Sequence, residues 1–298
     1  MVDPARSMLI SPLTSKPQTS LPAGSGITNA YQLRRRDASE AGYRLPEHLI
    51  REMLRQLQVE HAAVSDGRYS CYRIAGCSRY GDIARTVECE VFGEFFGNTP
   101  ASMVEAYSQY EEHSVFLLVV DQASLLPAGA LRIITNSSHG LKTLNDLEEE
   151  PLKISTPSVL EYHRIDDPMN CWDVGTLAVL KNYRGQSHDH IISSMLYGLF
   201  YAEVSRARVD HVVAMLDKVA WRQLTEMLVV PFITIAGSAP FTYLGVPNTR
   251  AAYVHVPQVK PTVEAYLEKL EGNARRVLRP HLARLIYSEG LPPVIDVI

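Results

Sequence analysis

The sequence lacks the features that tie a protein to a membrane or to a nucleic acid. No apolar stretch is long enough to cross a bilayer, and the first residues contain no apolar segment typical of a secretory signal. With 29 Lys and Arg against 33 Asp and Glu the net charge is −4, so the composition gives no overall basic footprint for a phosphate backbone. We therefore expect a soluble, cytoplasmic protein with no membrane span and no nucleic-acid partner.

Paired cysteines and clustered histidines are also absent. The sequence has four cysteines, Cys71, Cys77, Cys89 and Cys171. None belongs to a Cys-x-x-Cys pair, so the sequence offers no zinc framework. His188 and His190 are two residues apart, which places them on different faces of a helix and makes them poor ligands for one ion. We expect reduced thiols and no metal site.

The chain divides by composition into three parts. Residues 1–45 are rich in Ser, Pro, Thr and Gly and show no sustained period, so we expect a flexible arm, or an arm that docks without regular structure. Residues 46–257 alternate helical and strand patterns and are predicted to form one domain. Residues 258–298 carry a helical pattern with breaks around Gly272 and Pro280, which predicts a C-terminal helical extension.

Apolar periodicity predicts the elements of the domain. A period near 3.6 residues indicates helices at 46–57, 82–95, 100–110, 187–205 and 217–227. Apolar, β-branched runs indicate strands at 69–75, 114–121, 129–135, 174–180, 211–216, 232–236 and 251–256. A turn at Leu126–Ala128 would join two of them as a hairpin, and residues 136–170 are expected to be a long functional loop or lid. Because a hairpin and a strand–helix–strand unit occur together, we predict an α/β fold with a mixed central sheet and flanking helices.

The turn that follows the fourth predicted strand is the most informative segment. Residues Leu177–Asp189 read LAVLKNYRGQSHD, which is a strand end, a turn and a helix start with Ser187 as a suitable N-cap. Unsatisfied backbone N–H groups and the helix dipole favour an anion at such a place, and Arg184 can add a charge-assisted contact. A pyrophosphate would fit this turn, although a capping Ser and a Gly also occur in strand–helix connections that bind nothing.

The same segment resembles the acyl-CoA loop of GNAT acyltransferases, whose pattern is Arg/Gln-x-x-Gly-x-Gly/Ala after an apolar strand. Arg184 matches the first position, whereas Ser187 and Asp189 stand at the two small-residue positions. A wider stretch, from about Glu90 to Val256, is similar to the autoinducer-synthase-like branch of that superfamily, which includes N-acyl amino acid synthases. The motifs that carry this similarity are Val91-Phe92 and Phe95, Asp121, Gly129, Leu131-Arg132, Trp172-Asp173 and Leu177-Ala178-Val179.

The resemblance implies a GNAT-like acyl-CoA N-acyltransferase fold. The implied reaction moves an acyl group from acyl-CoA or acetyl-CoA, or from an acyl carrier protein, to a small-molecule amine such as an amino acid by direct attack. The residues that it implies for binding the pantetheine and phosphates are Leu177, Val179, Arg184, Gly185, Gln186, Ser187, His188 and Asp189. Asp173 would be the base or would orient the amine, unless it only caps a strand or pairs with a basic neighbour. Arg132 would lie near the acceptor pocket, or else be an edge residue or a buried partner of an acid.

Two departures from the family pattern leave alternatives open. Thr176 stands where the autoinducer branch has an Arg, which argues against synthesis of acyl-homoserine lactones. The helix at 217–227 contains no Tyr to protonate the leaving thiolate, and Tyr243 is either a substitute acid or a packed aromatic. A non-catalytic module that binds acyl-CoA or a protein partner is therefore an alternative, as is an α/β domain without cofactor. The apolar helices near 46–57 and 262–287 could wall an acyl tunnel, or form core or the surface of a homodimer.

Overall fold

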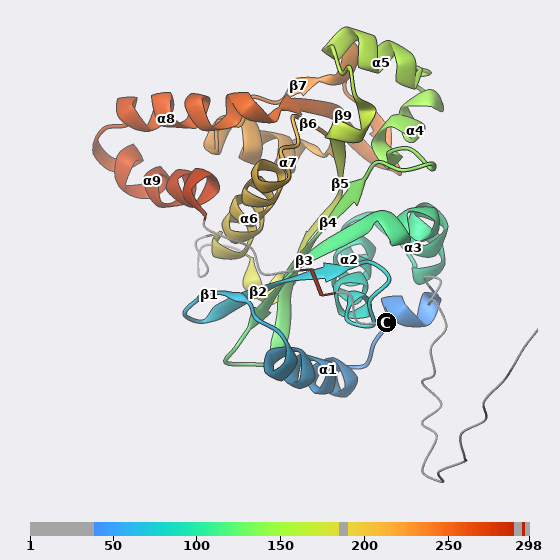
Figure 1. The fold of residues 1–298 in the computed structure, drawn as a ribbon, viewed down its shortest axis with the longest axis vertical. Coiled ribbons are helices and arrows are strands. Elements are labelled where there is room, and N and C mark those ends of the chain that lie inside the picture. The colour runs from blue at the N-terminus through green and yellow to red at the C-terminus, as the bar shows by residue number, and fades with distance from the viewer. Residues whose placement is uncertain (1–38, 185–189, 289–293, 296–298) are drawn as a thin grey trace, which may run out of the picture. The chain divides into compact units, whose positions relative to one another are not determined.

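The computed structural model describes residues 39–184, 190–288 and 294–295. Its centre is a mixed sheet with the strand order β1-β2-β3-β4-β5-β6-β9-β7, and β8 pairs with β9 (Figure 1). The strands are β1 (Val64–Asp66), β2 (Tyr69–Ala75), β3 (Ser114–Asp121), β4 (Leu126–Thr135), β5 (Cys171–Val179), β6 (His211–Leu216), β7 (Ile233–Thr234), β8 (Phe241–Tyr243) and β9 (Val246–His255). The pair β5–β6 is parallel and the other pairs of these strands are antiparallel. The predicted α/β fold with a mixed central sheet is confirmed.

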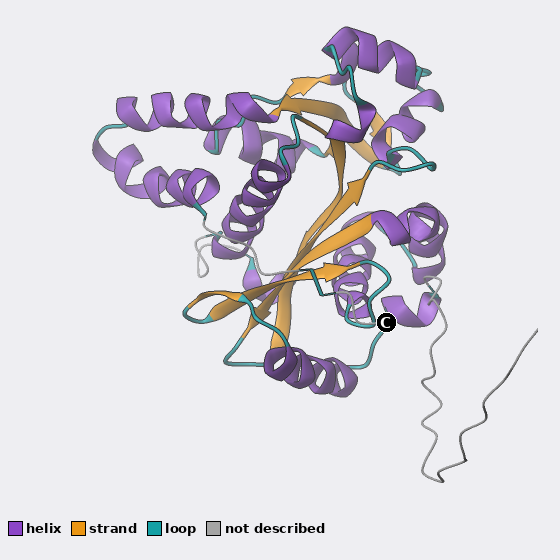
Figure 2. Cartoon of the chain, in the orientation of Figure 1, coloured by secondary structure: helices purple, strands orange, loops and turns teal. Residues whose placement is uncertain are grey.

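Helices cover both faces of this sheet (Figure 2). They are α1 (Glu47–Glu60), α2 (Gly81–Phe96), α3 (Pro100–Tyr107), α4 (Lys142–Glu148), α5 (Thr156–His163), α6 (Ile191–Ala207), α7 (Lys218–Arg222), α8 (Val259–Lys269) and α9 (Gly272–Tyr287). On β3, Phe116 and Leu118 join the apolar core of α1 and α2, whereas Leu117 and Val119 join the core of α6. Because successive strand residues point to opposite faces, the continuous apolar run of β3 reflects burial on both sides.

The C-terminal helices pack on the second half of the sheet. Val259 and Val263 of α8 and Leu282 and Leu285 of α9 belong to the same buried cluster as Val212 of β6. These helices therefore close the core on the side of β6 and β9, and α6 lies against α9.

Gly198 lets α6 and α9 approach closely. A Cβ at this position would lie 2.5 Å from the carbonyl oxygen of Arg284 and 2.5 Å from the hydroxyl of Ser288. We expect Gly198→Val to lower the free energy of unfolding by about 1–3 kcal/mol, because the two helices must move apart. Denaturant unfolding measures this loss. Ala207→Val, at an exposed position of the same helix, is the matched control, and an equal loss in both variants would point to β-branching rather than to the close approach.

Residues 136–170 are not the continuous loop that the sequence predicts, because they contain α4 and α5. The first turn of α4 is held by the side chain of Asp173, which lies 30 residues away in the sequence, so no local pattern reveals this helix. The hairpin turn is also displaced from the predicted position at Leu126–Ala128. β4 already begins at Leu126, and the connection to β3 occupies residues 122–125.

Two helix boundaries differ from the prediction as well. α6 begins at Ile191, and its N-cap residue is His190 in the left-handed conformation (φ 54°), with no side-chain capping bond. The predicted cap, Ser187, lies outside the described residues. α9 continues through Pro280 without the predicted break. The proline is exposed, so the backbone carbonyl that loses its helical donor can be solvated.

Candidate functional site

The strands β5 and β6 diverge after a short parallel contact. Their register pairs Cys171–Val174 with His211–Ala214 and ends there, although β5 continues to Val179. A cavity of about 470 Å³ opens at this divergence, and most of the side chains around it are apolar. Its walls come from α2, β5, β6, α6, α7, β8, β9 and the C-terminal helices. The divergence therefore exposes one edge of β5 to the cavity.

Gly175 forms a β-bulge on this wall. The register shifts between Arg132 and Ile133 of β4, which leaves Gly175 of β5 without a partner on the neighbouring strand. Its carbonyl accepts a hydrogen bond from the hydroxyl of Tyr107 at 3.1 Å. Gly175 and Thr176 both line the cavity, so the bulge lies at the surface that a substrate would contact.

Backbone groups after the bulge also turn toward the cavity. The N–H of Leu180 donates to β4, whereas the carbonyl of Val179 accepts from the Nε of Arg184. The N–H and C=O of a strand residue point to one side, and the side alternates along the strand. Leu177 and Val179 therefore direct their backbone groups away from β4 and toward the divergence, where β6 no longer pairs with β5.

Asp173 lies on the cavity wall two residues before the bulge. Its side chain is 0% exposed and accepts hydrogen bonds from the backbone N–H of Thr143 at 2.5 Å and from the hydroxyl of Thr143 at 2.9 Å. Burial raises the pKa of the carboxyl from 3.8 to about 7, against the lowering effects of the Thr143 bonds and of Lys142. A carboxyl that titrates near neutral pH can accept a proton from an amine. The structure thus brings Asp173 to the cavity, and its role as base stays a prediction.

Lys142 stands beside Asp173 on the same wall. It is the first residue of α4 and 7% exposed. Its Nζ donates to Asp146 at 2.6 Å and to the hydroxyl of Tyr243 at 3.1 Å, and this hydroxyl donates in turn to Asp146. No local pattern indicates Lys142, because it falls in the segment predicted as a loop and its partner Tyr243 is 101 residues away.

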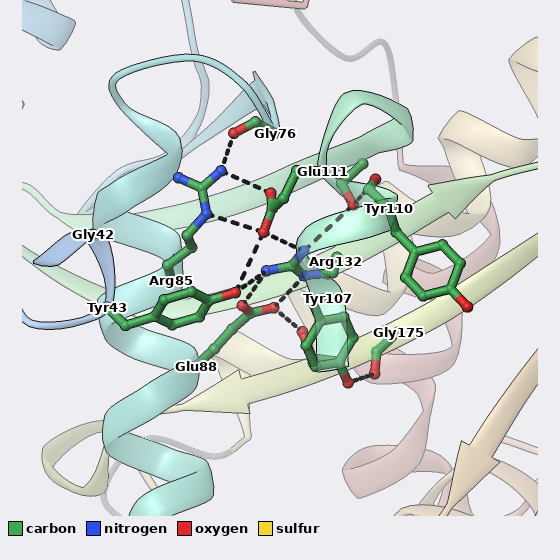
Figure 3. A network of polar contacts seen from close by, with 12 residues as sticks. Gly42, Tyr43, Gly76, Arg85, Glu88, Tyr107, Tyr110, Glu111, Arg132 and Gly175 are labelled. Atoms are coloured by element: carbon green, nitrogen blue, oxygen red, sulfur yellow. Dashed lines mark hydrogen bonds and ion pairs between the residues drawn. The ribbon is translucent and has the colours of Figure 1, made fainter. Parts of the chain in front are cut away.

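Arg132 lies in a buried polar network and does not line the cavity (Figure 3). Its guanidinium donates to Glu88 at 2.7 Å, to Glu111 at 2.9 Å and to the hydroxyl of Tyr43 at 3.2 Å. The side chains of Arg132 and Glu88 are both 0% exposed. The hydroxyl of Thr176 donates to Glu88, and Thr176 lines the cavity. Arg132 therefore lies behind the cavity wall, where its guanidinium carbon is 4.5 Å from the ring centre of the lining residue Tyr107, and it reaches Thr176 through Glu88.

Arg85 extends this network along α2 (Figure 3). It contacts Glu111 at 2.7 Å and Asp82 at 2.6 Å. Burial would raise the pKa of Glu111, but Arg132 and Arg85 outweigh it and hold that pKa below its usual range. Tyr43, in the turn η1 (Glu40–Tyr43), is 1% exposed, so a residue assigned to the predicted arm is packed into the core. Asp82 and Arg85 stand three residues apart on α2, a spacing that the sequence can show, whereas Glu111 and Arg132 come from other elements.

Arg184 lies where β5 meets the cavity. Its guanidinium contacts Glu94 at 2.9 Å and stacks over the ring of Phe95, with 4.5 Å between the guanidinium carbon and the ring centre. Its Nη2 is buried and has no hydrogen-bond partner in the described part of the chain. The other residues predicted for the phosphates, Gly185, Gln186, Ser187, His188 and Asp189, lie outside the described residues.

Among the described residues, no group of three or more His, Cys, Asp or Glu side chains is placed to hold a metal ion. None of the four cysteines forms a disulfide. Across the described ranges, every helix is too short or too polar to span a bilayer.

No protein-family model matches the sequence, and no curated protein sequence matches it either. The structure is similar to solved acyltransferases. FeeM, an N-acyl amino acid synthase from uncultured soil microbes, is 13% identical with a TM-score of 0.49, over 65% of this chain and 94% of FeeM. BjaI, a CoA-dependent acyl-homoserine lactone synthase, is 14% identical with a TM-score of 0.44, over 72% and 89%. Ribosomal-protein-S5-alanine acetyltransferase from Vibrio fischeri is 10% identical with a TM-score of 0.39, over 67% and 100%. At these identities and TM-scores the likeness gives no information about substrate or chemistry.

Proposed function

We propose that this protein is an N-acyltransferase that moves an acyl group from acyl-CoA, or from an acyl carrier protein, to the amine of a small molecule such as an amino acid. The observation that carries the proposal is the diverging edge of β5, which faces a cavity with Asp173 on its wall. A free strand edge can hold an extended donor, and a carboxyl that titrates near neutral pH can take the proton of an amine. Acyl transfer to an amine requires the donor-binding strand edge and the base to lie in one cavity.

The free edge of β5 suits the pantetheine arm of the donor. Pantetheine contains amide groups, which can bond to the backbone of Leu177 and Val179 as an added strand would. Arg184 stands at the end of this strand, and a donor phosphate would satisfy its buried Nη2. The next residues, 185–189, lie outside the described residues, and they are the segment that the sequence resemblance assigns to the phosphates.

The inner part of the cavity suits a long acyl chain. Buried apolar side chains line it there, including Val212 of β6, Val254 of β9, Val259 of α8 and Leu285 of α9. Each methylene that moves from water into such surroundings contributes about 0.8 kcal/mol. A chain that fills this part should therefore bind more tightly than an acetyl group. α8 and α9 line the cavity and α1 does not, so the acyl wall is assigned to the C-terminal helices.

The proposed reaction is a direct attack. Asp173 takes one proton from the ammonium group, and the nitrogen then attacks the thioester carbonyl carbon. The C–N bond forms, the C–S bond breaks, and the thiolate takes up the second proton that the new amide nitrogen loses. Backbone N–H groups beside the Gly175 bulge would stabilise the oxyanion. Arg132 would act indirectly, by holding Glu88 and thereby Thr176 on the cavity wall.

Calorimetric titration with acetyl-CoA and with a long-chain acyl-CoA tests the donor site. We expect the long-chain thioester to bind more tightly, and Arg184→Glu to weaken both by at least about tenfold, because a charge-assisted phosphate contact contributes about 1.5–3 kcal/mol. Arg222→Glu is the control, since Arg222 is 63% exposed on α7 and should leave both affinities unchanged.

The outcomes separate the competing functions. Binding followed by release of free thiol with an amine supports the acyltransferase. Tight binding without turnover on any amine would instead favour the non-catalytic acyl-CoA-binding module. If neither thioester binds and an acylated carrier protein also fails, the proposal is wrong and Arg184 does not bind a donor phosphate.

A further inference from the structure

Lys142 is a buried cation with an unused donor at the cavity wall. An ammonium group has three N–H donors, and two of them are accounted for by Asp146 and the hydroxyl of Tyr243. No third hydrogen-bond acceptor is found for Lys142 among residues 39–184 and 190–288. Its side chain is 9% exposed, and the residue lines the cavity. A buried N–H without an acceptor costs free energy unless a ligand supplies one.

The neighbours of Lys142 hold its ammonium group in place. The hydroxyl of Tyr243 accepts from Lys142 and passes its own hydrogen to Asp146, so the proton positions in this triangle are determined. Asp146 balances one positive charge and is partly exposed. The Tyr107 ring lies 5.4 Å from Nζ, and the hydroxyl of the same tyrosine bonds to the carbonyl of Gly175 at the bulge. Lys142 is thus fixed beside the place where the acyl carbonyl would lie.

An acidic and a basic side chain, Asp173 and Lys142, lie on the same cavity wall. Both line the cavity, and they are joined through Thr143, whose backbone N–H and hydroxyl bond to the Asp173 carboxylate. Thr143 follows Lys142 directly in the first turn of α4. An amine alone would satisfy Asp173 and leave the free N–H of Lys142 unpaired. A molecule with an ammonium and a carboxylate on the same carbon can pair with both.

We propose that Lys142 selects the acceptor by its carboxylate: the third N–H of Lys142 binds the carboxylate of an α-amino acid whose amine is directed at Asp173. This inference rests on the proposed acyltransferase function and adds the group by which the acceptor is selected. Lys142 is a specificity-determining residue, and Tyr243 and Asp146 position its ammonium group.

Steady-state kinetics with matched acceptors tests the inference. Each amino acid that is turned over is compared with its carboxamide, which has the same size and lacks the carboxylate charge. In the wild-type protein we expect kcat/KM to be about 10- to 100-fold higher for the acid than for the amide, the range of a hydrogen bond between charged groups. The difference should appear mainly in KM.

The variants separate recognition from folding. Lys142→Gln should bring the ratio of acid to amide close to one, by raising KM for the acid. It also removes a charge that lowers the pKa of Asp173, so kcat falls for both acceptors and the ratio is the readout for the carboxylate. Lys153→Gln, at an exposed lysine after α4, should keep the wild-type ratio. Should Lys142→Gln fail to fold, the wild-type comparison decides alone. Equal kcat/KM for acid and amide, or an equal loss for both in Lys142→Gln, overturns the inference while the acyltransferase stands. Absence of turnover with every amine overturns the proposed function and this inference with it.

Discussion

Asp173→Asn is expected to lower kcat for acyl transfer by about 100-fold or more while the protein stays folded. Asn has the shape of Asp and can keep both contacts with Thr143. Its carbonyl oxygen can accept from the backbone N–H, and its NH₂ can donate to the hydroxyl, which then accepts instead of donating. What the variant loses is the ability to take a proton from the amine. A variant with wild-type kcat would assign Asp173 to the structure of α4 alone.

The pH dependence distinguishes these two roles of Asp173. A base must be ionised, and burial raises the pKa of this carboxyl to about 7, so wild-type kcat should rise with pH through about 7 and then level off. Residual activity of the Asn variant should show no such step. A step that persisted in the Asn variant would show that another group titrates and that Asp173 is not the base.

Stability should change with pH in the opposite direction. The unfolded carboxyl ionises near 3.8 and the folded one near 7, so between these values the folded state holds a proton that the unfolded state has lost. The stabilising contribution of this group is therefore complete below pH 3.8 and is lost as the pH rises to about 7. The difference in pKa corresponds to about 4 kcal/mol. Denaturation of wild type and Asp173→Asn across this range measures it, because the variant lacks this titration.

The sequence predicts most of the sheet, because the longer strands carry their own local signal, whereas the three-residue strands β1 and β8 are not predicted. The predicted strands at 69–75, 114–121 and 211–216 match β2, β3 and β6 residue for residue, since their apolar, β-branched runs are buried on the sheet. The divergence of β5 from β6 has no such signal. It depends on where the parallel register ends, and a pattern with period two does not specify that.

The candidate site is only partly predictable for the same reason. Asp173 and Arg184 were found because they belong to short motifs that follow one another along the chain. Lys142 was missed because its environment is assembled from distant segments, with Tyr243 101 residues away. Arg132 also belongs to such a motif, but its partner Glu88 is 44 residues away. The sequence therefore does not show that the guanidinium is buried in an ion pair and does not face the acceptor.

The buried network around Arg132 gives the second large effect, on stability. Arg132→Met keeps an unbranched side chain of similar length and removes the positive charge. The carboxylates of Glu88 and Glu111 then lose their shortest contacts to Arg132, at 2.7 Å and 2.9 Å, in surroundings where water does not replace them. Removing one partner of a buried ion pair costs about 3–5 kcal/mol, and we expect a loss of this size in chemical denaturation.

Two further variants show whether the cost arises from the unpaired charge. The double variant Arg132→Met/Glu88→Gln neutralises the acid that is left behind, so it should recover part of the loss, because a buried pair replaced as a whole is far less costly than one that is broken. Arg222→Met breaks the exposed pair with Glu226, whose side chains are 63% and 58% exposed, and should change stability by less than about 1 kcal/mol. If Arg132→Met instead keeps wild-type stability and loses kcat, the guanidinium acts on the substrate and the enclosed network does not describe its role. A loss of stability with kcat per folded molecule preserved shows that Arg132 supports the cavity wall through Glu88 and Thr176 and leaves proton transfer to Asp173.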